Sequence, residues 1–186
     1  MKAPAMPYTL PRPAGMLGPT LGQAVAWLRA GQLDEAEGAF AALRASRPRD
    51  ADVLHFSGVL RQRQGRLDEG IALVRESIAV LPTNAHAHNN LGNLLVAAHR
   101  LAEALPCYEA SLAFAADADA RADAWTNIAA LQRRLSHLDE AETAARRAVR
   151  ARPAAAGARY ALAHVLADAG RVDDCLISNG CRILGT

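Results

Sequence analysis

An all-α fold built from repeated helical hairpins is what this sequence predicts, and three observations predict it. Hydrophobic residues make up 51% of the chain while aromatic residues make up only 4%, so the apolar mass is mostly alanine and leucine, which are strong helix formers. Particular residue types recur at a constant interval: Leu33, Leu67 and Leu101, for example, are separated by 34 residues twice. Within each interval the apolar residues follow the spacing of one helix face. A short array of two-helix units accounts for the composition and the period together.

Residues 1–19 precede the array, and we expect an irregular leader there. The segment contains Pro4, Pro7, Pro11, Pro13 and Pro19, and each proline removes a backbone donor and restricts the residue before it. The segment also lacks the continuous apolar region of a secretory signal. No stretch of the chain approaches the roughly 18 to 20 apolar residues of a membrane-spanning helix. We therefore expect a cytoplasmic protein that has no membrane partner.

Residues 20–175 form the predicted array of about five units. The interval between the third and fourth units is 37 residues, as from Asn90 to Asn127, so three extra residues lie within Ala115 to Ala122. We expect this insertion to lengthen a helix end or a loop. The predicted units begin near Leu17, Ala51, Ala85, Ala122 and Ala156.

The third unit, from Ala85 to Ala116, shows the two-helix pattern most clearly. Leu91 and Leu95 lie on one face of a first helix, and Gly92 between them lets another helix approach closely. Tyr108 and its apolar neighbours form one face of a second helix. Only a tight corner fits between the two patterns, so the unit is predicted to be an antiparallel pair.

Boundary residues repeat with the same period. Pro48, Pro82 and Pro153 are expected to end second helices, because the residue before a proline is pushed out of the helical region. Asp50 and Asn84 follow the first two prolines and stand where a short side-chain acceptor caps the next helix. His99 and Ser136 fall in hairpin turns where other units have glycine.

These marks resemble the tetratricopeptide repeat, a 34-residue helix-turn-helix unit with the pattern W-x2-L-G-x2-Y, then A-x3-F, then P. The third unit matches it with His88, Leu91, Gly92, Leu95, Ala104 and Tyr108, and the fourth with Trp125, Ile128, Ala129, Gln132, Ala141, Ala145 and Pro153. The resemblance implies a right-handed α-solenoid whose first helices line a concave groove. It also implies that the groove binds a protein or peptide partner.

The end of the chain departs from the pattern, so the last repeat is expected to be incomplete. Ser178, Asn179 and Gly180 form a turn signal inside the predicted second helix of unit five, and residues 176–186 are expected to be an atypical tail. Either that helix is short and the segment from Cys181 to Leu184 folds back as a cap, or the chain is a piece of a longer protein. The face left by an incomplete unit suggests self-association as a further hypothesis.

Charge and chemistry-bearing residues point away from other functions. The net charge is +2, and the basic residues are not interleaved with aromatic ones, so we expect no nucleic-acid partner. Cys107, Cys175 and Cys181 are too irregular for a disulfide framework or a metal site, and reduced thiols are expected. No catalytic motif is found. We therefore predict a protein that is not an enzyme and needs no cofactor or metal.

The candidate site consists of polar side chains on the groove side of the first helices. Asn90 and Asn127 share one repeat position, and an amide has donors and an acceptor that can grip the backbone of an extended peptide. Alternatively these amides solvate the groove or cap local backbone. Arg133 and Arg134, with Arg61 and Arg63, can attract acidic segments. The predicted groove residues are His55, Arg63, His86, Asn89, Asn90, Asn93, Asn127, Arg133, Arg134 and Tyr160.

Two functional hypotheses follow from the resemblance. In the first, the chain is a non-catalytic interaction module that binds a partner segment in the groove. The repeated asparagines resemble the ladder in the helical-repeat arm of O-linked N-acetylglucosamine transferases. In the second hypothesis, the chain is accordingly the substrate-recruiting arm of a larger glycosyltransferase-like, sulfotransferase-like or hydroxylase-like enzyme whose catalytic domain is absent.

Overall fold

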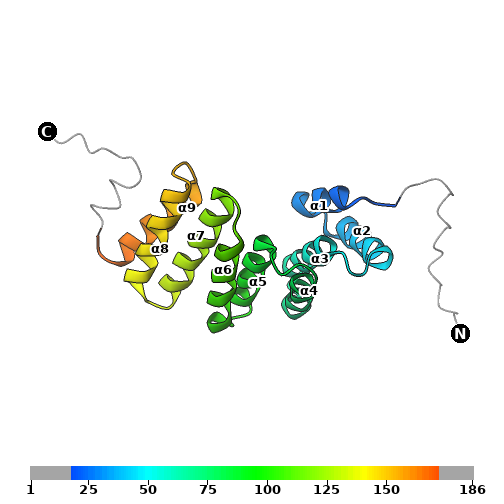
Figure 1. Ribbon diagram of the computed structural model, residues 1–186, viewed down its shortest axis with the longest axis horizontal. Helices are drawn as coiled ribbons and strands as arrows, with labels where there is room; N and C mark the ends of the chain where they lie inside the picture. The colour runs from blue at the N-terminus through cyan, green and yellow to red at the C-terminus, as the bar shows by residue number, and fades with distance from the viewer. Residues whose placement is uncertain (1–17, 172–186) are drawn as a thin grey trace, which may run out of the picture.

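The computed structural model describes residues 18–171, which form an elongated array of helical hairpins with α1 and α9 at opposite ends (Figure 1). The described part contains helices and no strand, which confirms the all-α prediction. The helices are α1 (Leu21–Ala30), α2 (Leu33–Ser46), α3 (Ala51–Arg63), α4 (Leu67–Val80), α5 (Ala85–Ala97), α6 (Leu101–Phe114), α7 (Ala118–Arg134), α8 (Leu138–Ala151) and α9 (Ala156–Asp168). We call the odd-numbered helices first helices and the even-numbered ones second helices.

Some of the predictions concern segments that lie outside the described residues. They are the leader except for Gly18 and Pro19, the tail at 176–186, and the pairing state of Cys175 and Cys181. The second half of the fifth unit lies there too.

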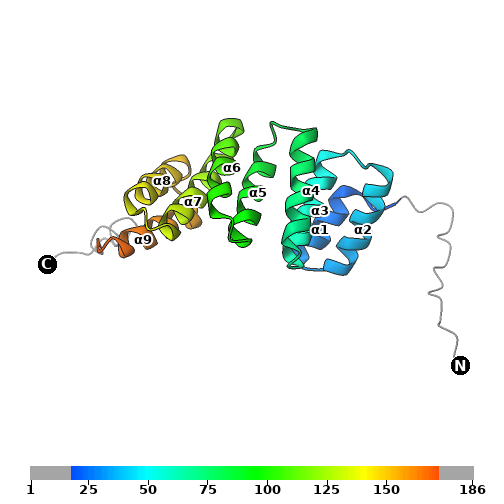
Figure 2. The same ribbon diagram turned by 90° about the horizontal axis from the view of Figure 1, so that it is seen from below.

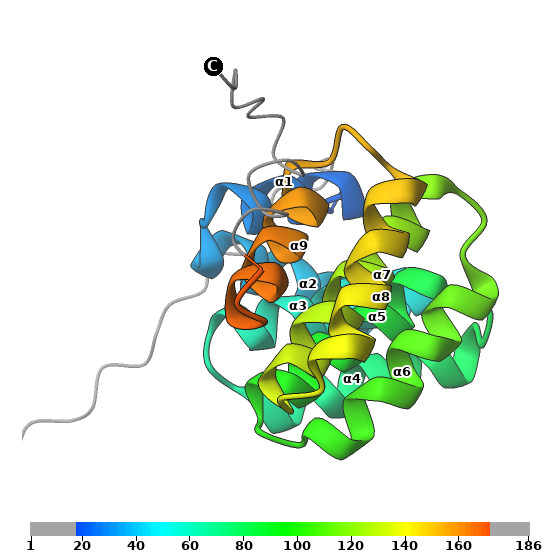
Figure 3. The ribbon, with the colours of Figure 1, turned by 90° about the vertical axis from the view of Figure 1, so that its left-hand side faces the viewer.

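Along the array, successive hairpins lie behind one another when viewed down the long axis (Figure 3), and Figure 2 shows the same order from below.

Each described hairpin turns through a residue with a left-handed backbone. The φ angles are 78° at Gly31, 76° at Gly65, 72° at Gly170, 59° at His99 and 61° at Ser136. These five residues occupy one repeat position, and the prediction that His99 and Ser136 are turn residues is confirmed. A side chain in the left-handed region costs roughly 1–2 kcal/mol relative to the right-handed one, so units three and four fold with some strain that the glycine units avoid.

The ends of the helices follow local chemistry. The Asp50 side chain accepts hydrogen bonds from the backbone N–H groups of Asp52 and Val53, and the Asn84 side chain accepts one from Ala87, so both predicted caps are confirmed. The second helices α2, α4 and α8 end at Ser46, Val80 and Ala151, shortly before a proline in each case.

The insertion lengthens α7 at its beginning. This helix has 17 residues, whereas α3, α5 and α9 have 13 each. It begins at Ala118, earlier than the Ala122 at which the unit was expected to start, because Asp117 caps it by accepting from the backbone N–H of Ala120 at 2.7 Å. The extra residues therefore lie in the first turn of α7.

Small residues let the two helices of a unit cross closely. A Cβ atom added at Gly92 would collide with the ring of Tyr108, and one added at Gly58 would meet Val74 and the carbonyl oxygen of Gly70. The predicted reason for Gly92 is thus confirmed. Two buried clusters form the core, one over α1 to α3 and the other over α4 to α9. Within residues 18–171, no helix combines the length and apolar character needed to cross a membrane.

Candidate functional site

A hollow of about 380 Å³ lies across the first helices of units one to three, and we call it the first-helix hollow. Three of its lining residues, His55, His86 and Asn90, were predicted groove residues, and the structure brings them together. The full lining is Arg29 from α1, Asp52, His55 and Phe56 from α3, and Asn84, His86 and Asn90 from the start and body of α5. Cationic, anionic, amide and aromatic groups thus meet in one place.

His55 is the buried centre of the hollow. Its side chain is only 3% exposed, and burial lowers its pKa from 6.5 to about 4, against the opposing effect of Asp52. The ring is therefore neutral at physiological pH. Its Nε2 accepts a hydrogen bond from the Asn90 amide at 2.7 Å, which places the ring proton on Nδ1. Phe56 lies beside the ring, with 4.8 Å between the ring centroids.

A second amide contact repeats the first one unit further along. The Asn127 Nδ2 group donates to Asn89 Oδ1 at 2.9 Å, joining α7 to α5 as Asn90 joins α5 to α3. His55 and Asn89 share one repeat position, and Asn90 and Asn127 share the next. Asn90 and Asn127 each use one N–H donor in the contact with the preceding unit. The other N–H donor and the oxygen lone pairs of each amide can still bind a further partner.

Asn93 has a different place from the other asparagines. Its Oδ1 accepts a hydrogen bond from the Tyr108 hydroxyl at 2.8 Å, so the contact ties α5 to α6 within one hairpin. Tyr108 is 2% exposed, and burial raises the pKa of its hydroxyl. Helix phase alone placed Asn93 on the groove side. In the structure its oxygen instead serves the Tyr108 hydroxyl, because a buried hydroxyl needs an acceptor within reach.

The predicted cationic and aromatic residues are spread along the array. Arg133 pairs with Asp168 at 3.0 Å, which joins α7 to α9. Arg63 and Arg134 are exposed at the ends of α3 and α7. Tyr160 is 68% exposed and lies edge-on to His164 with 4.2 Å between centroids. The structure does not gather these residues into the first-helix hollow.

Arg61, which was expected to attract acidic segments, forms ion pairs within the array. Its guanidinium contacts Glu37 of α2 at 2.6 Å and Glu69 of α4 at 3.5 Å. The two carboxylates come from segments on either side of α3, and only the tertiary packing brings them to one arginine. The hydrogen bond from Arg61 is also the main cause of the lowered pKa of Glu37.

Sequence reasoning missed Arg29 as a member of the site. Arg29, Arg63 and Arg134 occupy the same repeat position once the insertion is removed, and this period was the signal that could have found it.

Metal-binding and thiol groups add little to the site. In the part of the chain that the structure describes, no three His, Cys, Asp or Glu side chains gather where they could hold a metal ion. Cys107 lies on α6, away from the hollow, and its Sγ contacts the Glu103 carbonyl oxygen at 3.3 Å. Burial raises the pKa of this thiol, which lowers its reactivity.

Comparison with known families matches two models described as "Tetratricopeptide repeat", one over residues 21–85 and the other over 83–154. No curated protein sequence matches the chain.

Solved structures share the fold at low sequence identity. MamA is 16% identical with a TM-score of 0.70, over 85% of this chain and 91% of that one. The pilF protein of Pseudomonas aeruginosa is 15% identical with a TM-score of 0.79, over 89% and 74%. TTC0263, described as a thermophilic TPR protein of Thermus thermophilus, is 20% identical with a TM-score of 0.74, over 86% of both chains. These likenesses confirm the α-solenoid.

Proposed function

The chain belongs to the tetratricopeptide repeat family, and from this premise we propose that it is a non-catalytic module that binds an extended segment of a partner protein along its first helices. The observation that supports the proposal most is the first-helix hollow, which spans three units and holds amide, imidazole, carboxylate and guanidinium groups together. Pockets with a few convergent polar groups are the usual places for specific recognition.

Two kinds of contact would hold the segment. The amides of Asn89, Asn90 and Asn127 keep hydrogen-bonding capacity after their contacts with neighbouring units, and this capacity suits the backbone of an extended peptide. Arg29, Arg63 and Arg134 recur at one repeat position near the ends of first helices. Guanidinium groups in that register suit acidic side chains on the partner.

A photo-crosslinking experiment tests the location of binding. Benzoylphenylalanine placed at Phe56 in the hollow is expected to form adducts with a partner from a lysate of the source cells, and mass spectrometry identifies the crosslinked segment. The matched control carries the same group at Arg150, an exposed position of the second helix α8. Equal adduct yields at the two positions would contradict binding in the hollow.

The identified segment, made as a peptide, then tests the chemistry. Asn127→Ala is expected to weaken its binding by about 0.5–1.5 kcal/mol, the usual net contribution of one hydrogen bond. Because Asn127 also contacts Asn89, the unfolding midpoint of the variant must be measured beside the affinity. Unchanged affinity would remove the groove asparagines from the proposal.

The substrate-recruiting arm remains the alternative proposal, and what supports it is the pair of repeated asparagines, Asn90 and Asn127, which resemble the asparagine ladder. In that case the bound segment is an enzyme's substrate and the catalytic domain is encoded beyond Thr186. A continuing reading frame that encodes such a domain would favour the arm.

Self-association through the fifth unit is a separate hypothesis. It predicts light scattering whose apparent mass rises with concentration, and this rise should disappear when residues 178–186 are removed.

A further inference from the structure

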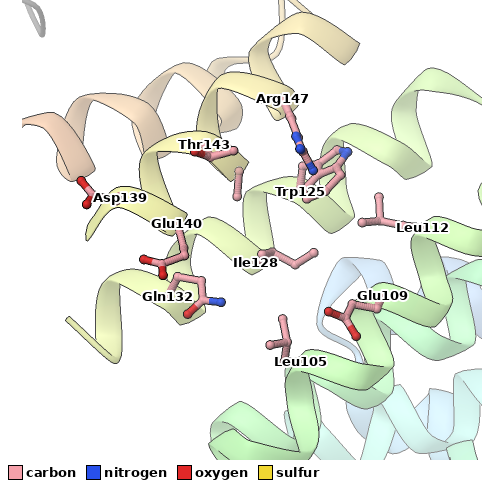
Figure 4. A pocket seen from close by; sticks show the side chains of 11 residues that line it. Leu105, Glu109, Leu112, Trp125, Ile128, Gln132, Asp139, Glu140, Thr143 and Arg147 are labelled. Atoms are coloured by element: carbon pink, nitrogen blue, oxygen red, sulfur yellow. The ribbon is translucent and has the colours of Figure 1, made fainter. Parts of the chain in front are cut away.

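A second cavity lies between the second helices α6 and α8, on top of α7, and we call it the α6–α8 cleft. Its volume is about 460 Å³. Figure 4 shows side chains from three helices directed toward this one space. The large apolar side chains are Leu105, Leu112, Trp125 and Ile128. None of these residues lines the first-helix hollow, so the cleft is a separate surface of the array.

Acidic groups surround the apolar part of the cleft. Glu109 of α6 and Asp139 and Glu140 of α8 line it, and none of the three forms an ion pair with another residue between 18 and 171. The one cation among the lining residues is Arg147, whose guanidinium lies over the Trp125 ring at 4.7 Å from the centroid. Carboxylates beside an apolar surface attract a cation that carries apolar groups of its own.

The preceding junction, between α4 and α6, has an ion pair at this place. Arg75 of α4 contacts Glu103 of α6 at 3.1 Å and so bridges the second helices of units two and three. The residues at the same two repeat positions in the next junction are Glu109 and Glu140. An attractive pair is thus replaced by two carboxylates, and the bridge between the second helices is lost.

The carboxylate of Glu140 also lacks the local partner that its counterparts have. Arg66 binds Glu69, and Arg100 binds Glu103, each through two nitrogens at 2.7–2.8 Å. Unit four has His137 at the position of these arginines, and its Nδ1 contacts Gln132 Oε1 at 3.0 Å instead. Both the cross-junction cation and the local cation are therefore missing around Glu140.

From these substitutions we propose that the α6–α8 cleft binds a basic amphipathic segment of a partner protein. A lysine or arginine of the segment takes the place that Arg75 has at the preceding junction, between Glu109 and Glu140. A neighbouring leucine, isoleucine or phenylalanine covers Leu105, Trp125 and Ile128. The proposal concerns a surface other than the first-helix hollow, and either can fail without the other.

Trp125 provides the measurement, because it lies in the cleft. In a Trp27→Phe background it is the only tryptophan, and its emission reports on the cleft alone. The probe is a synthetic helical peptide of leucine, alanine and lysine without aromatic residues. We expect it to shift the Trp125 emission to shorter wavelength with saturation, while a counterpart with glutamate for every lysine causes no shift.

One substitution builds the ion pair of the preceding junction into the cleft, where it competes with the peptide. Glu109→Arg restores the type of pair that Arg75 and Glu103 form, so it is expected to raise the unfolding temperature and to weaken binding of the lysine peptide by about tenfold or more. Glu76→Arg makes the same charge change at an exposed position of α4 and is the matched control, for which binding is expected to persist.

A milder pair of variants keeps the test decisive if Glu109→Arg folds poorly. Asp139→Asn/Glu140→Gln is expected to weaken the lysine peptide, whereas Asp34→Asn/Glu35→Gln, at the same repeat positions in unit one, is not. Equal binding of the lysine and glutamate peptides, binding without a change in Trp125 emission, or equal losses in the cleft and control variants would each overturn the proposal.

Discussion

Two surfaces of the array, the first-helix hollow and the α6–α8 cleft, differ in how their polar side chains are satisfied. In the hollow, His55 accepts from Asn90, and the same relation recurs between Asn89 and Asn127 of the next units. In the cleft, Glu109 and Glu140 face a space that no cation of the described chain fills by an ion pair. Internal pairing stabilises a junction between units but consumes hydrogen-bonding capacity, whereas the cleft keeps its full charge for a partner.

Acidification is expected to have the largest effect on stability, and it acts on the hollow through His55. The folded pKa of about 4 lies below the unfolded value of 6.5, so the unfolded chain binds a proton more readily between these values. Stability is therefore complete above pH 6.5 and is lost as the pH falls toward 4, by about 3 kcal/mol in all.

Urea unfolding at a series of pH values measures this loss. Carboxylates such as Glu37, whose pKa is also lowered, contribute to the acid loss of any variant. His55→Gln is the control that isolates the histidine, and its stability should change less between pH 6.5 and pH 4. The same pH dependence in both proteins would contradict the assignment.

Removal of the Tyr108 hydroxyl tests a polar contact that lies in neither surface. Tyr108→Phe leaves Asn93 Oδ1 without its donor and should lower the free energy of unfolding by about 1–2 kcal/mol. Tyr160→Phe removes the same atom from an exposed side chain and should leave the free energy unchanged. Denaturant titration compares the two, and similar losses would place the cause elsewhere than the buried hydrogen bond.

A double-mutant cycle over Asn89 and Asn127 measures the pairing in the groove directly. Their coupling energy should be favourable, at about 0.5–1 kcal/mol, because one amide donates to the other. The corresponding cycle over Glu109 and Glu140 in the cleft should give a coupling that is zero or unfavourable. A favourable coupling between the two glutamates would remove the contrast between the surfaces.

The smallest expected effect concerns the turn at His99, where a substitution should change stability without changing either surface. His99 joins α5, which serves the hollow, to α6, which serves the cleft, and its φ is 59°. His99→Gly relieves the left-handed strain and should stabilise the protein by about 0.5–1 kcal/mol. Thermal unfolding measures the gain, and Gly65→Ala is the opposite control. Binding at both surfaces should remain unchanged, since neither surface includes His99.

Because of the repeat, much of the fold could be predicted from the sequence. Leu33, Leu67 and Leu101 each begin a second helix, and Asp50 and Asn84 each cap a first one. These features depend on residues within a few positions of one another, so local rules are enough. The helical period also predicted that His55, His86 and Asn90 share one side of the array, and all three line the hollow.

The same rules could not assign partners across units. Helix phase treated Asn90 and Asn93 alike, yet one contacts His55 on α3 and the other contacts Tyr108 on α6. Arg61 was expected to attract acidic segments, and in the structure it lies between Glu37 and Glu69 of neighbouring helices. The direction in which a side chain leaves its helix is local information, whereas the group that it meets depends on how neighbouring helices pack.

Residues close together in the chain are therefore enough to specify the helices, their caps, their turns and the columns of residues that repeat along the array. Helix packing is needed to bring Asn127 to Asn89, 38 residues away, and to make Glu109 and Glu140 line an apolar cleft over Trp125. The difference is one of range. Backbone conformation follows from neighbours in the chain, while pairing and cavities arise from the separation of helices that packing brings together.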